Sequence, residues 1–268
     1  MMSTDIFSPL ANPNVPLQPA TAVVEFGSTL VVAPHPADES LGCGGAIALL
    51  RRMGCPVRVL VISDGTRSHP NSRAFPRAKL QALRERETLA ALSVLDVEPE
   101  AVTFLRLPDG AVPVPAADGF AQAVARCLTY LATFAISTIL LPWRRDPHPD
   151  HRSTWQLFHT ALEALSLSPR LVEYPVWDWD PDQRGDAPTP DEVTAWRLDI
   201  SAVLPQKLQA IAAHRSQTSD LINDDPEGFR LTPEMLAHFA HPWELYLEAC
   251  MSTTTGTSPV ACSSNSHF

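Results

Sequence analysis

Two short segments of the sequence combine imidazole and carboxylate side chains at a spacing that suits a metal ion. The first is His35-Pro36-Ala37-Asp38-Glu39, and the second is His148-Pro149-Asp150-His151. Catalytic zinc usually takes three protein ligands from histidine, aspartate and glutamate, and leaves a fourth position for water. A single His-Pro-x-Asp turn is more often only a turn or a helix cap. Two such turns that meet would instead predict a metal centre.

Each segment follows a short apolar run that predicts a buried β-strand, at residues 29–33 and 138–141. Strands and helices alternate along the chain, which is typical of a parallel, doubly wound sheet. In the common strand order 3-2-1-4, these two strands are neighbours. Ligands bind in the crevice beyond their carboxyl ends. We therefore expect the two segments to lie together.

The fold class predicted is α/β, a single Rossmann-like domain whose doubly wound, mostly parallel sheet carries helices on both faces. Residues 1–20 contain four prolines and are expected to form an irregular lead-in. Residues 21–250 form the domain, and the Ser/Thr-rich residues 251–268 are expected to be disordered. The other expected strands are 57–62, 102–105, 171–176 and 196–200. The expected helices are one that begins near Leu41 and ends near Met53, and those at 79–95, 120–131, 151–165 and 204–215.

Composition limits the partners and the compartment. The net charge of -10 argues against nucleic acid or an anionic membrane as the main partner, and is compatible with a small polar substrate. Five widely spaced cysteines without a C-x-x-C pair fit a reducing compartment, so a cytoplasmic protein is expected. We find no signal peptide and no apolar run long enough to span a membrane. Whether the chain forms a homo-oligomer is left open.

The spacing of the candidate groups suggests how they divide the chemistry. Three of them can point at one centre: His35, Asp38 and His151. His148 would then be free to act on the substrate, with Asp150 or Asp146 fixing its tautomer. The same side chains could also form a binding pocket without catalysis.

A different class of function starts from the glycines after the first strand. Gly42-Cys43-Gly44 opens the expected helix, and Asp64 ends the second strand about twenty residues later. This imitates a dinucleotide-binding fingerprint. The match fails in detail because Ile47 occupies the third glycine position and a polar segment separates the strand from the glycines. A nucleotide-cofactor-binding protein is therefore the weaker alternative.

The motifs together resemble the PIG-L/LmbE family of zinc-dependent N-acetyl-sugar deacetylases. The residues that carry the resemblance are Pro34-His35-Pro36-x-Asp38-Glu39, Gly42-x-Gly44-Gly45 and His148-Pro149-Asp150-His151-Arg152. Weaker matches are Asp64-Gly65, Arg84-x-x-Glu87, Leu105-x-Leu107-Pro108-Asp109-Gly110, and Lys207 followed by His214-x-Ser216-Gln217. The resemblance runs from about residue 30 to residue 217.

The resemblance implies a role for each matching position. The zinc ligands would be His35, Asp38 and His151. His148, oriented by Asp150, would donate a hydrogen bond to the tetrahedral intermediate or protonate the leaving amine. Arg84 and Asp109 would lie near the sugar, although Arg84 could merely pair with Glu87 on an exposed helix face. Asp109 could equally be only part of a turn, and the residues His214, Ser216 and Gln217 are expected to be structural.

The sequence departs from the family motif at Ala37, where the family has the aspartate that acts as general base. Loss of a positioned base typically costs about 10²–10⁴ in rate. The alanine could be an engineered change that traps a bound state, it could mark a natural pseudo-enzyme, or Glu39 could serve as the base. We therefore expect a metal-dependent hydrolase that deacetylates an N-acetylglucosamine-type sugar conjugate, with impaired turnover. The loop 66–76, Trp177 and Trp179 could form an acceptor rim or simply pack.

Overall fold

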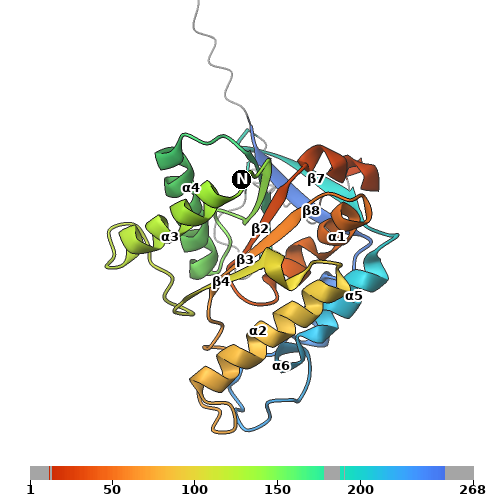
Figure 1. Cartoon of the computed structure of the whole chain (residues 1–268). Coiled ribbons are helices and arrows are strands. Elements are labelled where there is room, and N and C mark those ends of the chain that lie inside the picture. The colour runs from red at the N-terminus through yellow and green to blue at the C-terminus, as the bar shows by residue number, and fades with distance from the viewer. Residues whose placement is uncertain (1–11, 13, 178–187, 190, 251–268) are drawn as a thin grey trace, which may run out of the picture.

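A mixed eight-stranded sheet forms the centre of the molecule in the computed structural model (Figure 1), which describes residues 12, 14–177, 188–189 and 191–250. The strand order is β1-β7-β8-β6-β5-β2-β3-β4. In chain order the strands are β1 (Leu17–Gln18), β2 (Thr29–Ala33), β3 (Val57–Ser63), β4 (Val102–Leu107), β5 (Thr138–Pro142), β6 (Arg170–Tyr174), β7 (Val193–Asp199) and β8 (Trp243–Ala249).

The five strands β6-β5-β2-β3-β4 run parallel, which confirms the predicted fold class and the predicted order of the first four strands. Thr29 of β2 aligns with Val57 of β3 on one side and with Thr138 of β5 on the other. All five residues of β2 are buried, as expected for a central strand covered on both faces. The crevice between β2 and β5 is the switch point of the sheet.

Helices cover both faces of the sheet, as predicted. They are α1 (Asp38–Arg52), α2 (Arg77–Val94), α3 (Phe120–Thr133), α4 (Pro149–Leu165), α5 (Leu204–Ala213), α6 (Arg215–Thr218) and α7 (Pro233–His238), with short 3-10 helices at Ala20–Phe26 and Pro99–Ala101. The helices α3 and α4 lie on one face, and α1, α2 and α5 lie on the other (Figure 1). Successive residues of β2 follow this division: Val31 packs with the α1 side, whereas Leu30 and Val32 pack with the α3 side.

The start of α1 corrects the nucleotide-binding interpretation. The helix begins at Asp38, and the glycines 42, 44 and 45 lie inside it rather than in a loop before it. Gly42 permits close packing, since a Cβ there would stand 2.3 Å from the ring of Tyr174. The first turn is already occupied by the carboxylates of Asp38 and Glu39, which would repel a pyrophosphate. The dinucleotide fingerprint is therefore wrong.

Two further parts of the sheet were not predicted. The strand β8 runs antiparallel between β6 and β7, and the expected lead-in contributes β1, which pairs with β7. The expected strand at 196–200 is observed as β7, which starts earlier, at Val193. No helix in the described part of the chain is both long and apolar enough to cross a bilayer. The predicted tail 251–268 lies outside the described residues.

Candidate metal centre and active site

His35 and Asp38 form a tight turn between the end of β2 and the start of α1. The amide of His35 donates a hydrogen bond to Oδ2 of Asp38 at 2.9 Å, and the same oxygen lies 3.1 Å from Nδ1 of the His35 ring. Asp38 is the first residue of α1, where a carboxylate faces the positive end of the helix dipole. The turn alone therefore fixes an imidazole and a carboxylate side by side.

His148 and His151 are held by the first turn of α4. His148 is the N-cap residue and Pro149 follows in the first turn, where its missing N–H is not needed. The amide of Asp150 donates a hydrogen bond to Nδ1 of His148 at 3.2 Å. Because Nδ1 accepts this bond, the neutral ring carries its proton on Nε2. His148 also lines the cavity described below, so it is placed to donate to a ligand.

The two segments meet at the carboxyl ends of β2 and β5. Nε2 of His151 lies 3.2 Å from Oδ2 of Asp38, the oxygen that is 3.1 Å from Nδ1 of His35. These separations are close to the edge of about 3.3 Å of a tetrahedron with ligand bonds of about 2.0 Å. Nε2 of His151 is buried, and it has no hydrogen-bond partner among the described residues. One oxygen of Asp38 thus lies at the spacing of two zinc ligands from a ring nitrogen of each of these two histidines.

A second carboxylate lies close to the other ring nitrogen of both His35 and His151. Nε2 of His35 lies 3.0 Å from Asp150, and Nδ1 of His151 lies 3.4 Å from Asp146. Metal-binding histidines usually present their second nitrogen to such a carboxylate. From the sequence, we expected one of these aspartates to orient the His148 ring. Both carboxylates instead face the candidate ligands, and it is the backbone amide of Asp150 that contacts the His148 ring.

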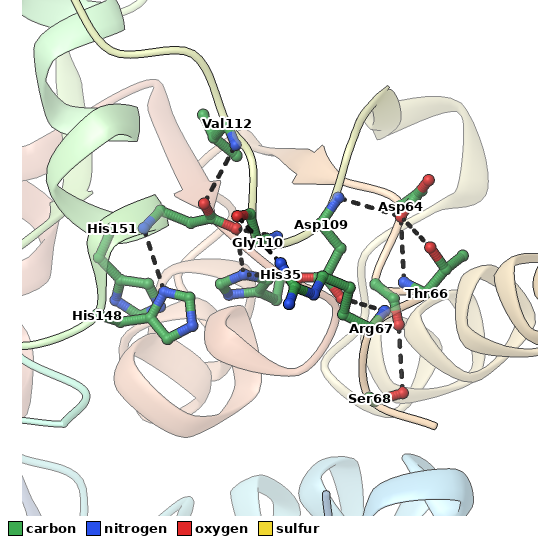
Figure 2. A network of polar contacts seen from close by, with 12 residues as sticks. His35, Asp64, Thr66, Arg67, Ser68, Asp109, Gly110, Val112, His148 and His151 are labelled. Atoms are coloured by element: carbon green, nitrogen blue, oxygen red, sulfur yellow. Dashed lines mark hydrogen bonds and ion pairs between the residues drawn. The ribbon is translucent and has the colours of Figure 1, made fainter. Parts of the chain in front are cut away.

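The same two carboxylates connect the candidate centre to neighbouring loops. Asp150 accepts hydrogen bonds from the amides of Gly110 and Val112 at 2.7 and 3.1 Å (Figure 2). Asp146 accepts hydrogen bonds at 3.1 Å from the amides of residues 176 and 177. Both side chains are buried. These bonds hold the two carboxylates in place, and therefore also the two rings that they support.

The acidic surroundings determine the charges of the three histidines. Burial alone would lower the pKa of His151, but Asp146 and Asp38 outweigh this effect and raise the pKa to about 9. Hydrogen bonds to nearby carboxylates likewise outweigh burial at His35 and raise its pKa well above the usual value. Burial and the positive charges of the other two rings lower the pKa of His148 to about 4. His148 is therefore neutral at pH 7, whereas the positive charges of the protonated His35 and His151 rings compensate the negative charges of the carboxylates.

Ala37 occupies the position at which the family resemblance implies the general base. Its φ of 100° is in the left-handed region, which is costly for residues other than glycine. Its amide donates to Oε2 of Glu39 at 3.0 Å, and its carbonyl accepts hydrogen bonds from the amides of Ser40 and Leu41. The backbone is thus fixed on both sides. The residue lines the same cavity as His148.

Glu39 is fully buried and is not among the residues that line the cavity. Its Oε1 accepts a hydrogen bond from the hydroxyl of Ser40 at 2.8 Å and lies 3.0 Å from Nε2 of His214. Its other oxygen holds the amide of Ala37. The hypothesis that Glu39 replaces the missing base therefore has no geometric support.

Arg84 is buried and lines the cavity. Its guanidinium donates to the carbonyls of Gly65 at 2.8 Å and Pro36 at 2.6 Å. Gly65 has a φ of +65°, and a Cβ there would lie 2.7 Å from Nη1 of Arg84, so the turn requires glycine. The alternative of an exposed Arg84–Glu87 pair is wrong, because Glu87 is buried and instead accepts hydrogen bonds from the amide and hydroxyl of Ser216.

Asp109 lies between the candidate centre and the loop at residues 66–76 (Figure 2). One carboxylate oxygen is 3.3 Å from Nε2 of His35, and the other accepts a hydrogen bond from the amide of Arg67 at 2.7 Å. Burial opposes ionisation, but the hydrogen bond and charge of His35, the charge of Arg84 and the amide of Arg67 together outweigh it and lower the pKa of Asp109 to about 2. Asp109 is therefore an ionised acceptor at the cavity wall, and more than part of a turn.

These residues surround a cavity of about 530 Å³. Arg67 and Ser68 from the loop 66–76 and Trp177 also line it, whereas Trp179 lies outside the described residues. Gln217 was expected to be structural, yet it lines the cavity, and its Oε1 has no hydrogen-bond partner among the described residues. A single glutamine within the short helix α6 gives no local signal of this placement. Only its position in the family motif could have indicated it.

Comparison with known proteins identifies relatives of this chain. Residues 30–162 match the model of the PIG-L family, described as GlcNAc-PI de-N-acetylase. A probable N-acetyl-alpha-D-glucosaminyl L-malate deacetylase 2 of Bacillus subtilis is 26% identical over 212 residues, which are 78% of this chain and 91% of the relative.

Two solved structures show how widely the fold is used. The N,N'-diacetylchitobiose deacetylase from Pyrococcus horikoshii has a TM-score of 0.55 and 23% identity, over 73% of this chain and 72% of that chain. The 4-carboxy-2-hydroxymuconate hydratase from Pseudomonas putida KT2440 has a TM-score of 0.60 and 20% identity, over 88% and 100%. At these identities the likeness shows the fold alone, and this fold also serves a hydratase. The family match is more specific, because its span includes both histidine segments, and so the chain contains a PIG-L family domain.

Proposed function

We propose that the chain is a zinc-dependent hydrolase that removes the acetyl group from the amide nitrogen of an N-acetylglucosamine-type conjugate. The observation that carries the proposal is that Oδ2 of Asp38 lies 3.1 Å from Nδ1 of His35 and 3.2 Å from Nε2 of His151. The family match and the N-acetylglucosaminyl substrate named for the Bacillus relative support the substrate class. A buried acidic pocket with two imidazoles favours a cation over an anionic cofactor.

The residues around the candidate centre would have different roles in amide hydrolysis. Bound zinc would supply a water of lowered pKa and a Lewis acid for the acyl carbonyl. Neutral His148 would donate its Nε2–H to the carbonyl oxygen, where negative charge develops as the bond is attacked. The ionised carboxylate of Asp109 would accept hydrogen bonds from sugar hydroxyls, and Arg84 would hold the cavity wall in place.

Ala37 would leave the attacking water without its expected proton acceptor, and Glu39, which contacts His214, does not line the cavity. The chain as written would therefore bind zinc and substrate but turn over slowly, by the factor of about 10²–10⁴ that a positioned base supplies. This observation favours a second candidate, a non-catalytic protein that binds zinc and an N-acyl sugar. Restoring the carboxylate with Ala37→Asp distinguishes the two candidates, because only the hydrolase would gain activity.

The ligand assignment is tested by measuring the zinc bound per chain after equilibrium dialysis. We expect one zinc per chain in the protein and a loss of affinity of at least 100-fold in His151→Ala. The matched control is His159→Ala, because His159 is on the same helix with 43% of its side chain exposed. Unchanged zinc binding in His151→Ala would remove the assignment and, with it, the proposed hydrolase.

A further inference from the structure

The cavity beside the candidate centre has one strongly apolar wall. Its polar lining comes mainly from the groups already described, whereas the wall is formed by Leu41, Trp177, Phe229, Leu231 and Met235. The rings of Trp177 and Phe229 meet edge to face, with centroids 5.9 Å apart. Leu41 and Leu231 belong to a single hydrophobic cluster, against which Trp177 and Met235 pack. Four of these five side chains thus belong to or pack against one hydrophobic cluster, and Phe229 contacts it through Trp177.

Part of this wall is accessible, so it is not simply core. Phe229 is 40% exposed, although large apolar side chains in the described part of the chain are mostly buried. Its position is fixed: the amide of Phe229 donates to the carbonyl of Ser68, and the amide of Leu231 donates to the carbonyl of Gln217. An exposed aromatic ring that is held firmly at the mouth of a cavity is typical of a binding surface.

We propose that the substrate carries an alkyl or aryl group that lies against Trp177, Phe229 and Met235. This inference rests on the proposed function, and it names the part of the substrate beyond the N-acylated sugar. A second sugar would need hydrogen-bond partners for its hydroxyls, and the five side chains of this wall offer almost none. An apolar group gains affinity there without any such partner. It could be attached either at the amide nitrogen or at the anomeric oxygen.

Binding to the zinc-loaded protein, measured by calorimetry, tests the inference without depending on turnover. One series lengthens the N-acyl chain of glucosamine from acetyl to octanoyl, and the other lengthens the alkyl group of N-acetylglucosamine glycosides from methyl to octyl. In one of the two series, we expect the Kd to fall about fourfold for each buried methylene group until the wall is covered. The series that shows this trend identifies the point of attachment.

Two truncations test whether the wall is responsible. Phe229→Ala and Met235→Ala should flatten the dependence of affinity on chain length and leave the Kd of the shortest ligand within about twofold. Leu208→Ala is the matched control, because Leu208 is 38% exposed on α5 and does not line the cavity. Met235→Ala keeps the test valid if Phe229→Ala folds poorly.

The outcomes separate this inference from the proposed function. Binding of the shortest ligands with no dependence on chain length in either series would overturn the apolar subsite and leave the hydrolase standing. Tighter binding of N,N'-diacetylchitobiose than of any alkyl glycoside would also overturn it in favour of a second sugar. If no ligand of either series binds to zinc-loaded protein, both the subsite and the proposed function fail.

Discussion

Replacing Ala37 with aspartate should restore a proton acceptor in the cavity and raise deacetylation by about 10²–10⁴, which is about 3–5 kcal/mol of the barrier. The backbone is ready for this change. The amide and carbonyl of residue 37 are held by Glu39, Ser40 and Leu41 through bonds that do not involve the side chain. The side chain at position 37 lines the same cavity as His148.

Because the backbone at residue 37 is in the left-handed region, the control variant must have a side chain of the same size and shape as aspartate. A φ of 100° is strained for alanine by roughly 1–2 kcal/mol, and aspartate and asparagine tolerate the left-handed region better. Ala37→Asn therefore changes size and strain in the same way as Ala37→Asp but adds no base. We expect both variants to unfold at a slightly higher denaturant concentration than the parent, and only the aspartate variant to gain activity.

The assay is release of acetate from N-acetylglucosamine conjugates by zinc-loaded protein, with zinc content measured for every variant. The expected ranking is Ala37→Asp far above Ala37→Asn, with the asparagine variant within a few-fold of the parent. Equal rates for the aspartate and asparagine variants, at equal zinc content, would refute the missing-base explanation. A parent that is already as fast as Ala37→Asp would show that another group takes the proton.

Three other changes probe the surroundings of the candidate centre. Asp146→Asn should weaken zinc binding about 10–100-fold, because the Asp146 carboxylate lies beside Nδ1 of His151 and orients that ring. An unchanged zinc affinity in equilibrium dialysis would contradict this role of Asp146. In metal-free protein, the raised pKa of His151 contributes stability that is fully present below pH 6.5 and is lost as the pH rises through about 9. The midpoint of denaturation should therefore fall over that pH range in metal-free protein and stay constant in zinc-loaded protein. A midpoint that does not change with pH in metal-free protein would contradict the raised pKa. Lys207→Met should cost about 3–5 kcal/mol in the free energy of unfolding because it strands buried Glu244, and a cost below about 1 kcal/mol would show that the pair is not essential.

The order of the central strands could be predicted because strands such as β2 are buried on both faces and therefore are continuously apolar. The strand β8 escaped prediction for the opposite reason. Its inward residue Glu244 is charged, and it is buried only because it accepts hydrogen bonds from the amides of Gly45 and Ala46, from Lys207 and from the hydroxyl of Tyr246. No local pattern distinguishes such a residue from one on a solvated surface.

The residues of the candidate site could be predicted, but the hydrogen bonds and ion pairs among them could not. Spacing along a turn placed His35 beside Asp38, because three residues of backbone leave little freedom. The direction of the Asp150 carboxylate depends instead on the amides of Gly110 and Val112, which come from a distant loop. Glycine disfavours helices, and at Gly42 of α1 packing against Tyr174 overrides that preference.

The buried carboxylates around the candidate centre need a compensating positive charge, and a bound cation would supply it. Asp38, Asp146 and Asp150 are each at most 3% exposed, and a buried carboxylate is costly unless a positive charge compensates it. Protonation of His35 and His151 supplies that charge at neutral pH, but it weakens as the pH rises, whereas a divalent ion supplies it throughout. None of the bonds that position these five side chains involves the side chain of residue 37. Loss of the base would therefore impair turnover while metal and substrate binding persist.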